Sequence, residues 1–199
     1  MISRRTAIGA LAAVTGGTMG ASSARGGDAP APAGAAAVPT YKFRMLKAKA
    51  RVYEGGNIRE HRIHDFPESH NMSAGVITLE TGAFREPHWH PNSDEWAYIL
   101  EGKVQLTVVG AHGQTTVEEF EYGDAWFVPI GFGHVVVNLG DSPAQVLVVH
   151  NHSDFSTVEL SEWVAGGPKD VFATSLNVPE QTLDRVPKKK LFLAKKKKS

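Results

Sequence analysis

The stretch GAFREPHWHPNSDE, residues 82–95, carries most of the information on how this chain folds. His88 and His90 are two residues apart, and in a β-strand such side chains point to the same face of the sheet. A Pro-Asn pair then indicates a turn, after which Glu95 opens a second apolar run. We expect this run to form a strand that lies antiparallel beside the first, so that the Glu95 carboxylate reaches the two imidazoles.

A second segment, GDAWFVPIGFGHVVVN at residues 123–138, supplies a fourth polar group. Gly131 and Gly133 permit a sharp reversal of the backbone, and a strand begins at His134. Two imidazoles and a carboxylate suit a divalent ion of the Mn, Fe, Zn or Ni type, and His134 adds a third imidazole. The two segments together therefore predict a metal site.

Short apolar runs separated by Gly, Pro, Asn and Asp fill the chain from Tyr41 to Val149. Turns that recur every 8–12 residues or so favour an antiparallel sandwich or barrel, and hence an all-β fold. After Val149 the pattern predicts two short helical pieces, Glu159–Ala165 and Thr182–Arg185. The predicted strands are Gly75–Leu79, Glu95–Leu100, Val104–Val109, Thr115–Phe120, Ala125–Val128, His134–Asn138 and Gln145–Val149.

The N-terminal 24 residues have the features of an export signal. Arg4 and Arg5 precede a mostly apolar run from Ala7 to Met19, which is shorter than the roughly 20 apolar residues of a transmembrane helix. The arginine pair resembles a twin-arginine signal, so we expect a periplasmic or extracellular protein. A plain Ala-rich tail is the alternative. Residues 25–40, rich in Ala, Pro and Gly, predict a flexible linker.

Charge and cysteine content exclude several classes of protein. The chain has 21 basic and 21 acidic side chains, but Arg4, Arg5 and the seven lysines after residue 187 leave 12 basic against 21 acidic ones in between. This acidic body argues against binding to nucleic acid, which needs a basic face. The absence of cysteine excludes disulfides, thiolate ligands and a cysteine nucleophile.

The two segments resemble the two motifs of the cupin family. The spacing G-x5-H-x-H-x4-E-x6-G runs from Gly82 to Gly102, and G-x5-P-x-G-x2-H-x3-N runs from Gly123 to Asn138. The resemblance implies a single jelly-roll barrel over residues 41–152, followed by a lid and helical extension over 153–193 and a Lys-rich tail over 194–199. It also implies that the ion is bound inside the barrel by His88, His90, Glu95 and His134.

The match extends to one domain of the microbial oxalate decarboxylases, over about residues 41–193. It is carried by the stretches RVYEGGNIRE, FREPHWHPNSDEWAYILEG, FVPIGFGHVVVNLGD and VELSEWVA. This resemblance implies manganese as the ion, with Fe, Ni and Zn left open, dioxygen as a cofactor and oxalate as the substrate. Members of that family have two cupin domains where this chain has one, so a homo-oligomer is also expected.

The resemblance directs attention to Arg85, three residues before His88. It implies that the guanidinium points into the pocket beside the ion, where it can hold a carboxylate by two parallel hydrogen bonds. A surface salt bridge to Glu86 or Glu101 is the alternative. The remaining histidines are interpreted as surface or structural residues: His61, His64, His70, His112, His150 and His152.

Decarboxylation also needs a proton donor, which family members carry as a glutamate on a lid after the barrel. Residues 152–157, HSDFST, contain no glutamate, and Asp154 is the nearest carboxylate. If Asp154 delivers the proton, the products are formate and CO2; if it does not, oxidation to CO2 and hydrogen peroxide is the alternative. A metal-binding cupin with little turnover is the third hypothesis, and a turn-forming role for Asp154 also stays open.

Overall fold

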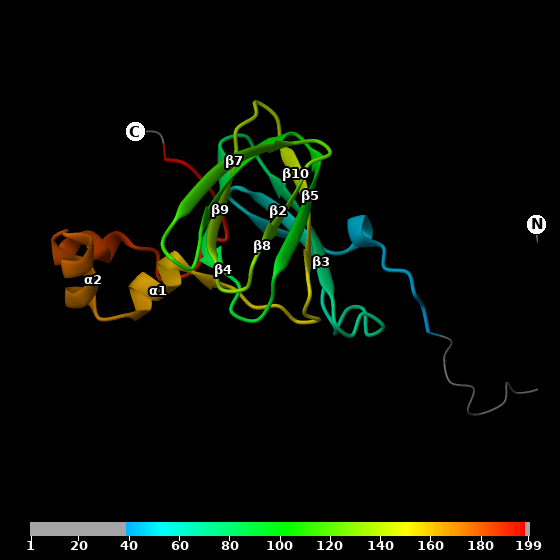
Figure 1. Ribbon diagram of the computed structural model, residues 1–199, viewed down its shortest axis with the longest axis horizontal. Helices are drawn as coiled ribbons and strands as arrows, with labels where there is room; N and C mark the ends of the chain where they lie inside the picture. The colour runs from blue at the N-terminus through cyan, green and yellow to red at the C-terminus, as the bar shows by residue number, and fades with distance from the viewer. Residues whose placement is uncertain (1–38, 198–199) are drawn as a thin grey trace, which may run out of the picture. The chain divides into compact units, whose positions relative to one another are not determined.

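Two antiparallel sheets face each other as a barrel in this computed structural model, which describes residues 39–197 (Figure 1). The first sheet has the strand order β1-β2-β3-β10-β5-β8 and the second β11-β4-β9-β6-β7, with β12 also paired to β4. The strands are β1 (Arg51–Tyr53), β2 (Gly56–His61), β3 (Ser73–Leu79), β4 (Ala83–Trp89), β5 (Glu95–Glu101), β6 (Lys103–Val109), β7 (Thr115–Glu121), β8 (Ala125–Val128), β9 (Gly133–Asn138), β10 (Ala144–His150), β11 (Val158–Glu159) and β12 (Leu193–Lys195).

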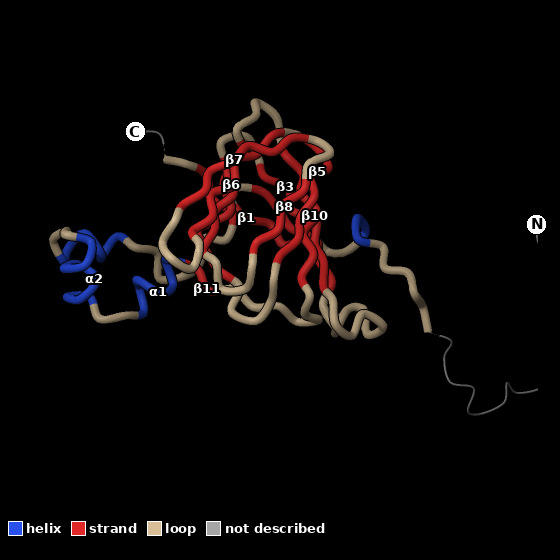
Figure 2. Tube along the Cα trace, viewed as in Figure 1, coloured by secondary structure: helices blue, strands red, loops and turns tan. Residues whose placement is uncertain are grey.

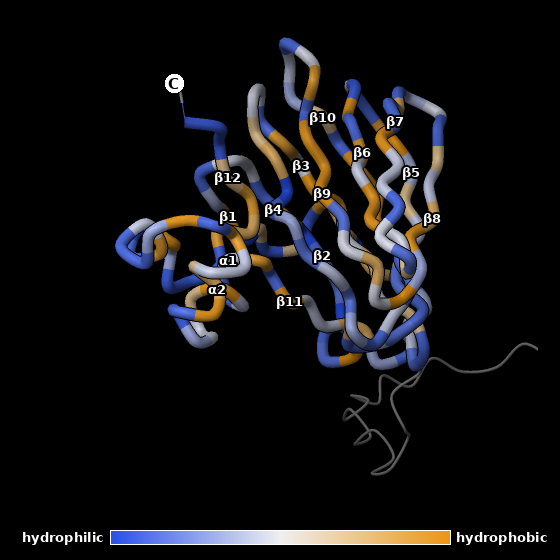
Figure 3. Tube along the Cα trace, turned by 60° about the vertical axis from the view of Figure 1, so that its left-hand side comes forward, coloured by the Kyte–Doolittle hydropathy of each residue, from blue (hydrophilic) through white to orange (hydrophobic). Residues whose placement is uncertain are grey.

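The barrel interior follows from the alternation of apolar residues along the strands. Val104 and Leu106 in β6, and Val146 and Val148 in β10, are buried, while the residues between them are partly exposed. Hydrophobic residues run along β9 and β10, and hydrophilic ones gather at the turns (Figure 3). This architecture confirms the predicted all-β class, and all seven predicted strands are present with ends displaced by two residues at most.

One prediction about the sheets is wrong. The strand that opens at Glu95 does not lie beside the strand that carries His88, because β5 belongs to the first sheet and β4 to the second. Strand β4 pairs instead with β9, and His88 lies directly opposite His134 in that pair. Glu95 therefore approaches the histidines from the facing sheet, across the interior of the barrel.

The C-terminal extension contains α1 (Leu160–Gly166), α2 (Lys169–Leu176) and the 3-10 helix η2 (Glu180–Arg185), while a further 3-10 helix, η1 (Met45–Lys47), precedes the barrel. The helices after β11 gather on one side of the strands (Figure 2). Helix α2 lies outside the two predicted helical pieces. Pro168 directly precedes its first residue, where no intrahelical hydrogen bond needs its missing N–H.

From η2 the chain returns to the barrel and adds β12 to the edge of β4. No helix within residues 39–197 has the length and apolar character needed to cross a bilayer. The predicted signal of residues 1–24, most of the predicted linker and the last two residues of the lysine-rich tail lie outside the described residues.

Candidate metal centre

The three histidines of the two motifs meet inside the barrel. His88 lies in β4, His90 just after it and His134 in β9, and all three are buried. The ring centroids of His88 and His134 are 4.1 Å apart, and that of His90 lies 5.0 Å from His88 and 5.3 Å from His134. The β4–β9 pairing shifts register between Arg85 and His88, just before the ligand-bearing end of β4.

Each imidazole is oriented by a backbone carbonyl. The Nδ1 atoms of His88, His90 and His134 lie 2.7, 3.0 and 3.1 Å from the carbonyl oxygens of Glu86, Ser156 and Phe132, respectively. A carbonyl can only accept, so each Nδ1 carries the hydrogen and each Nε2 keeps its lone pair. Three lone pairs are therefore available at one point of the interior.

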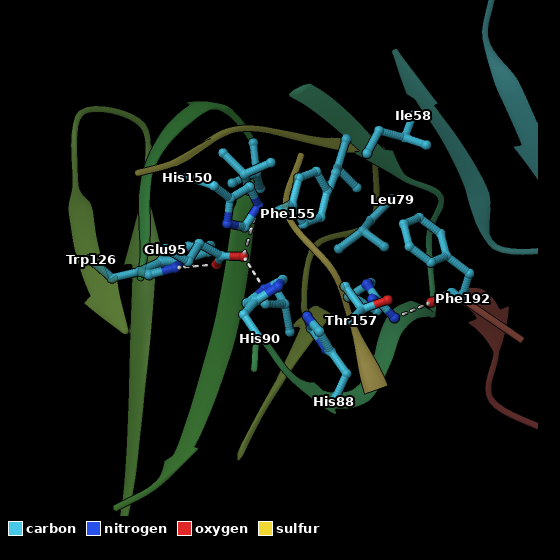
Figure 4. Close-up of a pocket in the computed structure, with 15 residues that line it drawn as sticks. Ile58, Leu79, His88, His90, Glu95, Trp126, His150, Phe155, Thr157 and Phe192 are labelled. Atoms are coloured by element: carbon cyan, nitrogen blue, oxygen red, sulfur yellow. Dashed lines mark hydrogen bonds and ion pairs between the residues drawn. The ribbon is translucent and has the colours of Figure 1, made fainter. Parts of the chain in front are cut away.

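Glu95 completes the donor set from the opposite sheet. The Trp126 indole N–H donates to Oε1 of Glu95 at 3.0 Å, while Oε2 lies 3.1 Å from Nε2 of His90 (Figure 4). Burial raises the pKa of Glu95, but the interactions with His134 and His90 outweigh it and hold that pKa well below its ordinary value. The carboxylate is therefore ionised, as a metal ligand must be.

These four residues fit a divalent cation. One ligand atom from each of His88, His90, Glu95 and His134 lies within 4.8 Å of all the others, and Nε2 of His134 is buried with no hydrogen-bond partner among residues 39–197. Burial, followed by the charges of Arg85 and the other imidazoles, holds the pKa of His88 well below its ordinary value. Imidazole nitrogens and a carboxylate that converge on one buried point are the donor set that a divalent cation requires.

Arg85 lies in the same cavity, but its partner was not foreseen. Its Nη2 donates to Oε1 of Glu159 at 2.9 Å and its Nη1 to the Phe192 carbonyl at 3.3 Å. Arg85 is only 3% exposed, so the alternative of a surface salt bridge to Glu86 or Glu101 is wrong. Burial lowers the pKa of the guanidinium, and the Glu159 carboxylate opposes that effect.

Glu159 was interpreted as the start of a helix, whereas it ends β11 opposite His88. Its side chain is fully buried between Arg85 and Lys190, whose Nζ lies 3.5 Å from Oε2. The Thr157 hydroxyl also donates to Oε1 at 2.9 Å. A single buried glutamate beside a helix-like stretch gave no signal in the sequence, because its partners lie far along the chain.

His150 is a second residue that the sequence interpretation missed. It is 1% exposed, its ring stacks on Phe155 at 3.9 Å, and its Nε2 lies 4.0 Å from Oε2 of Glu95. Burial lowers its pKa to about 4. The signal was present, since the alternation of β10 places His150 on the same face as Val146 and Val148.

The structure does not bring Asp154 into the site. Its carboxylate is 48% exposed and accepts a hydrogen bond from Nη1 of Arg62 at 2.8 Å. That hydrogen bond holds the pKa of Asp154 below its ordinary value. Asp154 lies in the loop between β10 and β11, and from that loop Phe155 and Thr157, not Asp154, line the cavity.

The cavity itself is small and mostly apolar (Figure 4). The space inside it for a water-sized group is about 20 Å³, enough for about one water molecule. A ligand must therefore be very small, or the wall must move to admit it. The lining residues are Ile58, Ile77, Leu79, Arg85, His88, His90, Glu95, Trp126, Val136, Val146, Val148, His150, Phe155, Thr157 and Phe192.

Comparison with known proteins agrees with this geometry. The chain is 32% identical to oxalate decarboxylase OxdC of Bacillus subtilis over 157 residues. This aligned region covers 79% of this chain and 41% of the relative. A structure concerned with the Mn(II) centres of that enzyme superposes with a TM-score of 0.75 at 29% identity, over 84% of this chain and 45% of the other. The formate complex of Lactobacillus farciminis oxalate decarboxylase superposes with a TM-score of 0.75 at 32% identity, over 81% of this chain and 48% of the other.

The chain thus spans less than half the length of these relatives. The cupin family profile matches residues 44–184, which include strands β1 to β11 and most of the helical extension. This match and the two motifs show that the chain belongs to the cupin family, and that its one matched cupin domain is related to those of the microbial oxalate decarboxylases.

Proposed function

We propose that this protein is a manganese-dependent oxalate decarboxylase, which converts oxalate and a proton into formate and CO2 with dioxygen as a cofactor. The observation that carries the proposal is that the Arg85 guanidinium lines the same buried cavity as His88, His90 and Glu95, three of the four metal-donor side chains. With an ion bound, such a cavity would have a metal cation on one side and, on the other, the Arg85 guanidinium, which can bind a carboxylate. A small acid with two carboxylates matches both charges, and the wall of the cavity would have to move to admit it, since the space inside is that of about one water molecule.

His88, His90, Glu95 and His134 would hold the ion. When bound, a redox-active divalent ion supplies positive charge and an electron-transfer partner for dioxygen at this centre. The donor set also suits Fe, Ni and Zn. Manganese is proposed because the solved relative contains Mn(II) centres.

Arg85 would bind and polarise the carboxylate of oxalate that does not ligate the ion. Its guanidinium is fixed by Glu159 and Phe192, so little side-chain entropy is lost when substrate binds. The apolar walls exclude water, which strengthens these charge interactions. We propose that this arrangement stabilises the charge that develops as the C–C bond breaks.

Proton delivery decides between decarboxylation and oxidation. Asp154 is the proposed proton donor, and it would have to leave Arg62 and turn into the cavity, since a general acid must come within hydrogen-bond reach of its target. The outward position of Asp154 favours a second candidate, an oxalate oxidase that converts oxalic acid and dioxygen into two CO2 and hydrogen peroxide.

The test uses protein that begins at residue 25, loaded with Mn2+ and given oxalate in air, with formate and peroxide measured in one tube. Mostly formate would support the decarboxylase, and mostly peroxide the oxidase. Neither product with metal still bound would refute both and leave a metal-binding cupin. The Arg85→Lys variant is the matched control: it should keep its metal and lose turnover.

We also propose that the protein is exported in folded form by residues 1–24. The supporting feature is the arginine pair before a weakly hydrophobic run. A reporter fused to residues 1–24 should reach the periplasm of a bacterial host, and replacement of Arg4 and Arg5 by lysine should stop it. Export that persists in the lysine variant would contradict a twin-arginine route.

A further inference from the structure

Phe192 comes from the far end of the chain and lines the cavity (Figure 4). The strand that follows it, β12, pairs with β4 so that Leu193 lies opposite Arg85. Phe192 is 5% exposed, and its ring packs on Tyr53 with centroids 4.8 Å apart. A residue 107 positions after Arg85 is therefore part of the wall beside it.

The backbone of Phe192 is in an unusual conformation. Its φ is 59°, in the left-handed region that favours glycine, and among residues 39–197 the other non-glycine residue with positive φ is Asn177. Asn177 caps the C-terminus of α2, where asparagine commonly adopts this conformation. A large aromatic residue does not, and such strain persists only where surrounding contacts enforce it.

Glu86 supplies those contacts. Its Oε2 accepts the backbone N–H groups of Leu191 and Phe192 at 2.8 and 3.1 Å, and its own N–H donates to the Phe192 carbonyl at 2.9 Å. Its Oε1 accepts the N–H of Ser161 at 3.3 Å. Glu86 is 3% exposed, so a buried carboxylate directly follows Arg85 and holds Phe192 in place.

In this strained conformation both the backbone carbonyl and the aromatic ring of Phe192 contact Arg85. The carbonyl accepts from Nη1 at 3.3 Å, and the ring face lies 3.9 Å from the guanidinium carbon. Glu159 takes Nη2. The guanidinium is thus held at two nitrogens and over one face, and cation–π contacts of this kind are strongest where water is excluded.

We propose that Phe192, held by Glu86, is a positioning residue for Arg85 and that the C-terminal segment thereby sets the affinity of the cavity for a carboxylate. That the carboxylate is oxalate rests on the proposed function. The contact between Phe192 and the guanidinium does not, and the two can be tested apart.

The first measurement is oxalate affinity of Mn-loaded protein by calorimetry without dioxygen, so that the proposed reaction does not proceed, with Mn content measured in parallel. Phe192→Leu should keep its manganese and bind oxalate about tenfold more weakly, as expected for the loss of a cation–π contact in a site without water. Phe192→Tyr keeps the ring and should retain wild-type affinity. Lys195→Ala, an exposed change in the same segment, is the control for general effects.

A double-mutant cycle separates positioning from general destabilisation. In an Arg85→Met background, which leaves no cation beside the ring, Phe192→Leu should cause no further loss of oxalate affinity. A full tenfold loss in that background would overturn the proposal, because Phe192 would then act independently of Arg85. If Phe192→Leu does not fold, Phe192→Met takes its place in the cycle.

The second measurement needs no oxalate. In zinc-loaded, 15N-arginine-labelled protein, the ring of Phe192 should shift the Arg85 guanidinium N–H resonances upfield, and Phe192→Leu should remove that shift. An unchanged spectrum would refute the positioning role. If wild-type protein shows the shift but binds no oxalate, the proposed function fails while the role of Phe192 stands.

Discussion

Replacement of Glu159 by glutamine removes one charge from a buried ion pair and keeps the shape of the side chain. The glutamine oxygen can still accept from Nη2 of Arg85 and from the Thr157 hydroxyl, as Oε1 of Glu159 does. The guanidinium is then left buried without the counter-charge that contacts it, and only the charges of Glu95 and Glu86 still act on it. The new amide also faces Nζ of Lys190, which lies 3.5 Å from Oε2 in the wild type.

The expected cost is about 3 kcal/mol of unfolding free energy, the lower end of what breaking a buried pair removes. Urea unfolding followed by tryptophan fluorescence measures it, and the melting temperature should fall by about 10 °C. The double variant Arg85→Met/Glu159→Leu replaces the pair by apolar groups and should regain most of that stability. It should remain without turnover, because no guanidinium is left.

The result that would refute this reasoning is a Glu159→Gln protein within about 0.5 kcal/mol of wild type, the range of an ordinary surface substitution. Glu159 would then not be needed to balance Arg85. A double variant that is less stable than either single variant would also contradict it. Such an outcome would mean that the two side chains contribute separately.

Three further variants test other parts of the site. Glu95→Ala should lose most bound manganese by elemental analysis, because it removes the only charged donor of the four; full occupancy would contradict the ligand assignment. Asp154→Asn should lower the ratio of formate to peroxide if Asp154 delivers the proton, and an unchanged ratio would exclude it. His150 stays neutral in the fold until about pH 4 while the unfolded chain takes up its proton near pH 6.5, so folded stability should fall by about 3 kcal/mol as the pH drops through that window. In His150→Phe that loss should be absent from urea titrations between pH 6.5 and 4, and an identical pH dependence would show that His150 is not its source.

The parts of the fold that depend on local pattern could be predicted from the sequence. Val104 and Leu106 alternate with polar residues, and the spacing of the two motifs brings His88 and His134 to the interior. The pairing of strands could not be predicted in the same way. Strand β5 follows β4 after a short turn, yet the two lie in different sheets, because the chain crosses the barrel between them.

The residues that surround Arg85 were beyond the reach of local pattern. Glu159 and Phe192 contact it from 74 and 107 positions away. No local sequence pattern around either residue indicates that its partner is Arg85. Asp154 was singled out because it is an acid near the right place in the chain. Its direction depends on Arg62, which lies 92 positions earlier, and this ion pair turns it outward.

The division of the donors between two sheets has a thermodynamic consequence. Three imidazoles come from the β4–β9 side and the carboxylate from β5 on the facing sheet, so the four donors are close together only when the barrel is closed. An ion bound there fastens one sheet to the other and has no comparable site on the unfolded chain. Barrel stability should then follow the supply of free metal, with about 1.4 kcal/mol gained for every tenfold rise above the dissociation constant. The melting temperature of this protein would thereby report the metal concentration of its surroundings.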